Sequence, residues 1–103
     1  MNDMLTSLTL LSAADEDGAP VKCQRSGRYC LSVNGAFDGA TVGISMLGPD
    51  GSNYIALKDE AGTIALTAAD AIAIILPAGT FKGTISSAGA STSVYMKLDR
   101  MID

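Results

Sequence analysis

The side chains best suited to chemistry in this chain of 103 residues are two cysteines and eleven carboxylates, and the sequence contains no histidine. Without histidine, a serine or cysteine nucleophile has no imidazole base, and most zinc sites lack a preferred ligand. Two cysteines are too few for a structural zinc site of their own. The sequence therefore predicts neither a catalytic triad nor a metal centre.

The carboxylates fall mainly where the chain is expected to turn, at residues 15–17, at Asp50 and at residues 59–60. A glycosidase needs two convergent carboxyl groups, whereas turn positions favour solvation and local backbone hydrogen bonds. The acidic stretch at 15–17 also lacks the remaining ligands of a calcium loop. The Gly-containing stretch 87–91 lacks the lysine and the strand–helix setting of a phosphate loop. We predict no enzymatic activity and no cofactor.

Cys23 and Cys30 are spaced so that a two-residue turn between them would place them opposite each other, within reach of a disulfide. A three-residue loop instead pairs Val21 with Val33 and Cys23 with Leu31, which keeps the apolar residues on one face. Because the buried face sets the register, we favour the second hairpin. It predicts a buried Cys23, a Cys30 that points the opposite way, and free thiols, as in a protein made in the cytoplasm.

The length fits one domain, and the net charge of −4 argues against nucleic-acid binding, which needs a basic patch. Among the seven basic residues, only Lys22, Arg25 and Arg28 cluster. The longest uninterrupted apolar run, residues 71–76, is too short to span a bilayer. The apolar segment 5–11 lacks the positive flank of a secretory signal. We expect no nucleic-acid, membrane or export function.

Short apolar–polar alternations separated by Gly and Pro fill residues 21–100, which is typical of antiparallel strands with one buried face. The residues predicted to face the core are Tyr29, Leu31, Val33, Val42, Ile44, Met46, Phe81, Gly83, Ile85, Val94, Met96 and Leu98. They predict an all-β fold, a small antiparallel β-sandwich or barrel with an N-terminal arm or extra strand.

Two proline turns should connect strands of this domain. Gly48-Pro49-Asp50-Gly51 predicts a hairpin between strands at 42–47 and 53–58, because Pro, Asp and Gly each suit their turn position. Pro77-Ala78-Gly79-Thr80 joins strands at 71–76 and 81–86. Residues 59–70 stay open, since Thr67 could begin a short helix. The Ala- and Ile-rich stretch at 71–76 suits either a core or a contact between copies.

The chain is expected to have two parts. Residues 1–19 form an arm or first strand plus an acidic linker, and residues 20–103 form the sandwich or barrel domain. The alternating leucines of the N-terminal part fit an ordinary first strand. They equally fit an arm that adds a strand to a partner's sheet edge. For the arm, the partner-binding candidates are Leu5, Leu8, Leu10 and Leu11.

Several turns and strand openings between residues 26 and 100 resemble small β-rich virion structural proteins of tailed bacteriophages. They are Ser26-Gly27-Arg28-Tyr29, the stretch 33–42, Leu47-Gly48-Pro49-Asp50-Gly51, the stretch 76–81 and Ser91-Thr92-Ser93-Val94-Tyr95. Within that group the chain is most similar to capsid decoration, or cement, proteins.

This resemblance implies a non-catalytic protein that is made in the host cytoplasm and bound to the outer capsid surface. Its partner would be the major capsid protein of a tailed phage, with homo-oligomers also compatible. Two alternatives stay open: a tail- or fibre-associated virion protein, and an extracellular Ig-like binding module.

Overall fold

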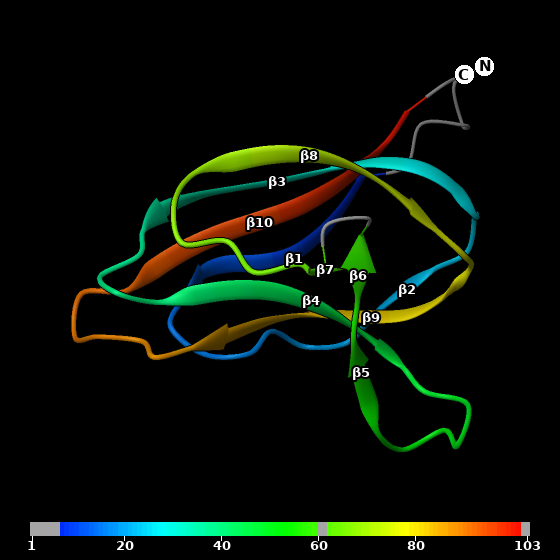
Figure 1. Ribbon diagram of the computed structural model, residues 1–103, viewed down its shortest axis with the longest axis horizontal. Coiled ribbons are helices and arrows are strands. Elements are labelled where there is room, and N and C mark those ends of the chain that lie inside the picture. Colours follow the sequence, from blue (N-terminus) through cyan, green and yellow to red (C-terminus); the bar gives the residue numbers. More distant parts are fainter. Residues whose placement is uncertain (1–6, 60–61, 102–103) are drawn as a thin grey trace.

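The computed structural model of the protein describes residues 7–59 and 62–101, which form strands and turns and no helix. One four-stranded sheet contains β1 (Ser7–Ala14), β10 (Ser93–Arg100), β3 (Gly27–Ala36) and β8 (Asp70–Leu76), in that order. The second contains β2 (Val21–Cys23), β9 (Gly79–Ser86), β4 (Thr41–Leu47) and β5 (Tyr54–Ala56). All neighbours are antiparallel, and the sheets face each other (Figure 1). The predicted all-β sandwich is confirmed.

The strand order is that of a jelly roll. A small hairpin of β6 (Lys58–Asp59) and β7 (Gly62–Thr63) stands apart from the two sheets. Counting the other eight strands in chain order gives sheets of order 1-8-3-6 and 2-7-4-5. Two Greek-key motifs folded into facing sheets produce this arrangement. An immunoglobulin fold keeps its first two strands in one sheet, whereas β1 and β2 lie in different sheets here.

The core lies between the sheets, and the residues predicted to face it do so. Tyr29, Leu31, Phe81 and Leu98 are fully buried. Met46 and Ile85, at the margins, are partly buried and pack against the same cluster. Since the described residues form no helix, none of them forms one that is long and apolar enough to cross a bilayer.

Gly83 lets β9 approach the opposite sheet closely. A Cβ at this position would lie 2.7 Å from Leu11 Cγ and 2.7 Å from Met96 Cε, closer than real side chains pack. The inward face of β9 therefore requires glycine at position 83, because any side chain there would clash with Leu11 and Met96.

The hairpin predicted at Gly48-Pro49-Asp50-Gly51 is confirmed. The Gly51 N–H donates to the Gly48 carbonyl at 3.0 Å, and β4 pairs with β5 so that Met46 lies opposite Ile55. The return strand spans three residues, because the chain leaves the sheet after Ala56. Two later residues contact β4 again: Leu57 N–H donates to the Ile44 carbonyl, and Leu66 bridges to Val42. The stretch left open in the sequence thus holds a small hairpin and a bridge, and β8 begins at Asp70.

The hairpin predicted around the cysteines is wrong. β2 pairs with β9, with Cys23 opposite Gly79, while β3 lies between β10 and β8. Residues 24–26 therefore carry the chain from one sheet to the other. Two strands can bury the same side chains in one core whether they pair in a hairpin or lie in two facing sheets. The pattern of buried residues therefore could not distinguish these two arrangements. The predicted orientations hold: Cys23 is buried, Cys30 is half-buried on the opposite side of its sheet, and both are free thiols.

Candidate functional site

The outer face of the first sheet is formed by four strands of seven to ten residues, whereas two strands of the second sheet have only three residues. Register fixes its rows: Thr9 lies beside Lys97, Lys97 beside Ser32, and Ser32 beside Ala71. The outward side chains of this face are Ser7, Thr9, Ser12, Arg28, Cys30, Ser32, Asn34, Ala71, Ala73, Ile75, Tyr95, Lys97 and Asp99. Small side chains dominate it, so the sheet backbone lies close to the surface.

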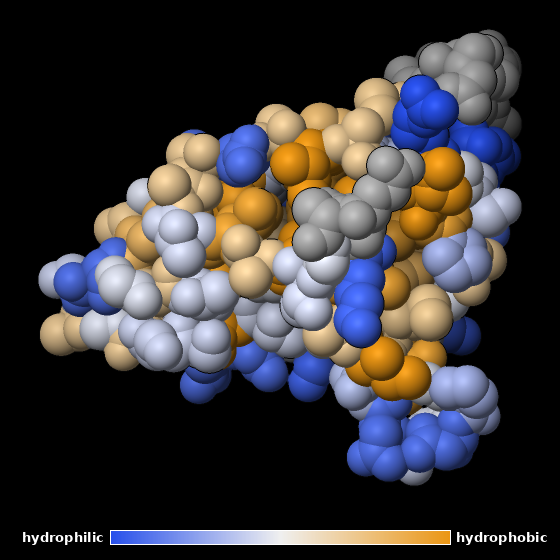
Figure 2. All heavy atoms as spheres, in the orientation of Figure 1, coloured by the Kyte–Doolittle hydropathy of each residue, from blue (hydrophilic) through white to orange (hydrophobic). Residues whose placement is uncertain are grey.

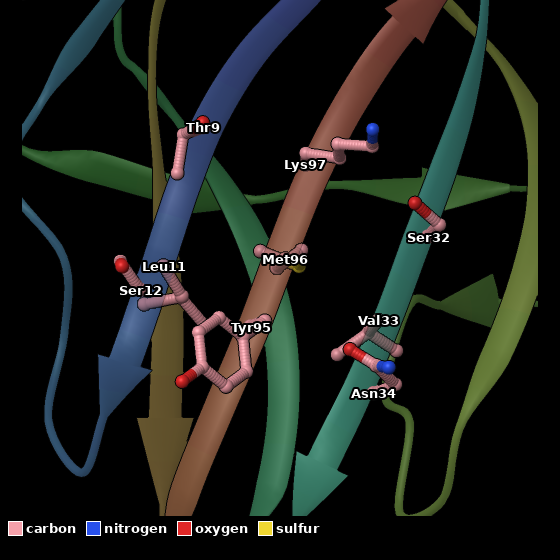
Figure 3. A pocket seen from close by; sticks show the side chains of 9 residues that line it. All are labelled: Thr9, Leu11, Ser12, Ser32, Val33, Asn34, Tyr95, Met96 and Lys97. Carbon is pink, nitrogen blue, oxygen red and sulfur yellow. The ribbon is translucent and has the colours of Figure 1, made fainter.

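A shallow depression of about 700 Å³ occupies the part of this face formed by β1, β10 and β3. Its outward lining is polar: Thr9, Ser12, Ser32, Asn34, Tyr95 and Lys97 (Figure 3). The short side chains on β1 and β3 leave the hollow, and the longer Tyr95 and Lys97 rise from β10 within it. The Tyr95 ring lies between β10 and Ser12 of β1 (Figure 3). Half of Tyr95 is exposed.

In its described part, this face carries three charged side chains, Arg28, Lys97 and Asp99, of which the last two form a pair. Lys97 Nζ lies 3.5 Å from Asp99 Oδ2, on the same side of β10. Both side chains are partly exposed, so the pair contributes little to the free energy of folding. Its effect is to hold the ammonium and the carboxylate together beside a surface of hydroxyl groups.

The depression has the groups for binding. Thr9, Ser12 and Ser32 supply hydroxyls that donate and accept hydrogen bonds. Across residues 7–59 and 62–101, no three His, Cys, Asp or Glu side chains converge to hold a metal ion. Small-molecule sites are usually concave pockets that enclose most of the ligand, whereas this hollow is shallow and open. Its geometry fits a broad protein surface, for which an exposed tyrosine is a common anchor.

None of the predicted partner-binding leucines that the structure describes is exposed, although Leu11 is among the residues that line the depression. Leu10 and Leu11 are 3 % and 2 % exposed and belong to the core, and Leu8 is partly buried against it. Leu5 lies outside the described residues. The described part of the segment, β1, pairs with β10 as the first strand of the domain. Its leucines are packed inside, which corrects the idea that they form an arm free to bind a partner.

Both Leu10 and Leu11 reach the core because β1 is irregular. Its register with β10 shifts between Thr9 and Leu11, and again between Leu11 and Ala14. A bulge of this kind places two consecutive residues opposite one partner residue and turns the strand. A strict two-residue alternation, on which the sequence argument depended, cannot anticipate it.

The acidic linker that follows β1 is anchored to the second sheet. Asp17 Oδ1 accepts a hydrogen bond from the Ile85 N–H at 2.9 Å, and its other oxygen lies 3.6 Å from Lys82 Nζ. The Gly18 N–H donates to the Gly83 carbonyl at 3.0 Å. Lys82 also lies over the Tyr54 ring, 4.5 Å from its centre. These contacts give Asp17 a structural role, because they tie the linker between β1 and β2 to β9.

Two groups with shifted pKa values also have structural partners. Burial, then its hydrogen bond with Cys23, raises the pKa of Tyr29 to about 12. The Tyr29 hydroxyl in turn donates to the Arg25 carbonyl. Hydrogen bonds from the Asn53 and Ser52 backbone lower the pKa of Asp50 to about 2. Both groups hold turns, and neither lies on the outer face.

Sequence reasoning placed Tyr95 and Lys97 opposite the core face, and that orientation is confirmed. It did not bring them together with Thr9, Ser12 and Ser32, because the pairing of β10 with both β1 and β3 joins residues far apart in the chain. No protein-family model matches the chain, and no curated protein or solved structure is significantly similar to it.

Proposed function

We propose that this protein is a non-catalytic structural protein that binds a larger protein assembly through the outer face of its first sheet. The supporting observation is the shallow depression, with outward hydroxyl side chains along its strands and the half-exposed Tyr95 within it. Tyrosine offers a large, stiff contact area and a polar end, and such residues carry much of the energy of protein interfaces. The sheet beneath holds these side chains in fixed positions, so binding costs little conformational entropy.

The assembly in this proposal is the head of a tailed phage, and the protein is a capsid decoration protein on its outer surface. The resemblance of residues 26–100 to such proteins supports this choice. Jelly rolls occur in viral capsid proteins, but also in lectins and other proteins, so the fold adds only compatibility. Free thiols fit a protein made in the host cytoplasm. The net charge of −4 would also limit adhesion to nucleic acid.

The major capsid protein is the expected partner. Many copies on a symmetric shell would stabilise it through repeated modest contacts, none of which needs high affinity alone. The strand order differs from that of an immunoglobulin fold, so the fold adds no support to the Ig-like alternative.

The proposal can be tested by co-sedimentation with expanded phage capsids that lack the protein. Tyr95→Ala should weaken binding by at least about tenfold, because it removes the anchor of the outer face. Ile55→Ala is the matched control: Ile55 is 51 % exposed, against 50 % for Tyr95, and lies on the second sheet. It should bind like the wild type.

Failure of the wild-type protein to sediment with capsids would contradict the decoration role. Binding that is lost in Ile55→Ala but retained in Tyr95→Ala would place the interface on the second sheet and overturn the proposed surface.

A further inference from the structure

Edge strands expose unpaired backbone groups, and most proteins protect them with short strands, bulges, prolines or lysines. Three of the four edges of the two four-stranded sheets have such protection. β1 carries two register shifts and a residue with positive φ, Ala13 (φ 49°). β2 and β5 are three residues long each, and β2 contains Lys22.

The fourth edge, β8, lacks these features. It is seven residues long and pairs with β3 without a register shift. It contains no Lys, Arg or Pro, and Pro77 follows only after its end. No other sheet strand in the described part of the chain lies beside it, and Figure 1 shows it at the margin of its sheet.

The side chains of β8 separate into two rows. Ile72, Ile74 and Leu76 face the core, while Ala71, Ala73 and Ile75 face outward. Ile75 is 77 % exposed, which is unusual for a large aliphatic side chain in a regular strand. Figure 2 shows apolar surface gathered over this strand. The strand's one charge, Asp70, lies at its start and accepts a hydrogen bond from the Ala71 N–H at 2.8 Å.

We propose that β8 pairs antiparallel with β8 of a second copy of this chain, about a two-fold axis at Ala73. The two four-stranded sheets then become one continuous sheet of eight. Ala73 lies at the middle of Asp70–Leu76, so this register overlaps all seven residues of both strands. It places Ala73 opposite Ala73, Ala71 opposite Ile75, and Ile72 opposite Ile74.

The strand is complementary to itself in this register. On the outer face, each exposed Ile75 packs beside the small Ala71 of the other copy. The two Asp70 carboxylates lie at opposite ends, each beside a Leu76, so no like charges face each other. An isologous contact of this kind closes at two copies, and the protected edges of the other strands prevent further growth.

A second copy is favoured over an unrelated peptide because the strand is complementary to an antiparallel copy of itself. The two lengths are equal, each Asp70 lies opposite Leu76, and each large Ile75 lies opposite a small Ala71. The depression on β1, β10 and β3 lies outside this contact, so it remains open in the pair. The inference is therefore independent of what the outer face binds.

Cross-linking tests the register directly. In a Cys30→Ser background, Ala73→Cys would place two thiols on directly opposite residues, with Cα atoms about 4.5–5.5 Å apart, which suits a disulfide. Ala71→Cys is the matched control, because residue 71 lies four residues out of register with its own copy, about 13 Å along the strand. Mild oxidation at about 0.1 mM protein should give a covalent dimer with Ala73→Cys and not with Ala71→Cys. Equal cross-linking of both variants, or of neither, would overturn the register.

Sedimentation equilibrium tests the pairing without a cross-link. The wild type should be a dimer at about 0.1 mM. Ala73→Lys should weaken dimerisation by at least about tenfold, because it places two ammonium groups opposite each other. Ala90→Lys, in an exposed loop, makes the same change away from the edge and should dimerise normally. Circular dichroism of each variant checks the fold. A wild type that stays monomeric at about 1 mM would overturn the proposal.

Discussion

At the scale of residues, a buried hydroxyl holds the point where the chain passes from the second sheet to the first. Tyr29 is fully buried, and its hydroxyl accepts a hydrogen bond from Cys23 and donates one to the Arg25 carbonyl. Arg100 adds a contact to the same loop, because its Nε and one terminal nitrogen both donate to the Ser26 carbonyl. The two ends of the crossing are thus fixed by side chains from β2, β3 and β10.

Tyr29→Phe should lower the free energy of unfolding by about 1–2 kcal/mol, because it removes the hydroxyl that donates to the Arg25 carbonyl and contacts the Cys23 thiol. Urea unfolding at neutral pH measures this change. Tyr95→Phe, which removes an exposed hydroxyl, is the control and should change it by less than about 0.5 kcal/mol. Equal effects of the two substitutions would contradict a structural role for the Tyr29 hydroxyl.

The same residue predicts a pH dependence. The pKa of Tyr29 is raised from its ordinary value of 10.0 to about 12 in the folded protein, so the unfolded chain loses this proton first as the pH rises. The stabilisation is fully present below pH 10 and should be lost between pH 10 and 12. This part of the alkaline destabilisation should be missing from Tyr29→Phe.

Asp50 gives the opposite dependence. Its Oδ1 accepts hydrogen bonds from the Ser52 and Asn53 N–H groups, each at 3.0 Å, and its pKa falls from 3.8 to about 2. The ionised side chain therefore stabilises the turn above pH 3.8, and this contribution is lost as the pH falls through about 2. Asp50→Ala should unfold at lower urea concentration than the wild type at pH 7. The gap should narrow toward pH 2; a gap that stays constant would contradict this role.

At the scale of elements, the stability of β1 variants distinguishes a free N-terminal arm from a first strand of the domain. Substituting the leucines of a free arm would leave the domain folded, whereas substituting those of a core strand would destabilise it. Leu11→Ala should lower the free energy of unfolding by about 2–5 kcal/mol, because a buried leucine leaves a cavity. Ser12→Ala, one residue on and exposed, should leave it within about 0.5 kcal/mol of wild type. An unchanged stability in Leu11→Ala would restore the arm.

Much of the element structure follows from local patterns. Alternation identified the inward residues of β3, β4, β9 and β10, and Pro and Gly located the turn between β4 and β5. Local patterns do not choose partners, since facing sheets bury the same side chains as a hairpin does. For that reason the expected pairing of β2 with β3 is wrong, and the bulges of β1 and the bridge from Leu66 to Val42 were not foreseen.

The candidate site shows the same limit more strongly. The outward orientation of Tyr95 and Lys97 follows from the alternation in β10 alone. The depression needs β1 and β3 on either side of β10, and these strands are separated from it by most of the chain. A surface made by long-range pairing leaves no local signal in the sequence.

At the scale of the whole molecule, the proposed edge pairing and the proposed binding face would act together. A dimer joined through β8 would present two outer faces on one continuous sheet. Two linked contacts on a repeating shell bind more tightly than one, because the second forms at high effective concentration. A variant confined to the monomer by Ala73→Lys should therefore bind capsids more weakly than wild type, even though the depression formed by β1, β10 and β3 is unchanged.

Quantitative mass spectrometry of purified phage particles tests the proposed function most directly. The copy number of this protein is measured against that of the major capsid protein in the same particles. A decoration protein should be present in numbers comparable to the capsid protein. Absence from the particles would contradict the virion role, and a handful of copies per particle would contradict decoration and place the protein in the tail or its fibres.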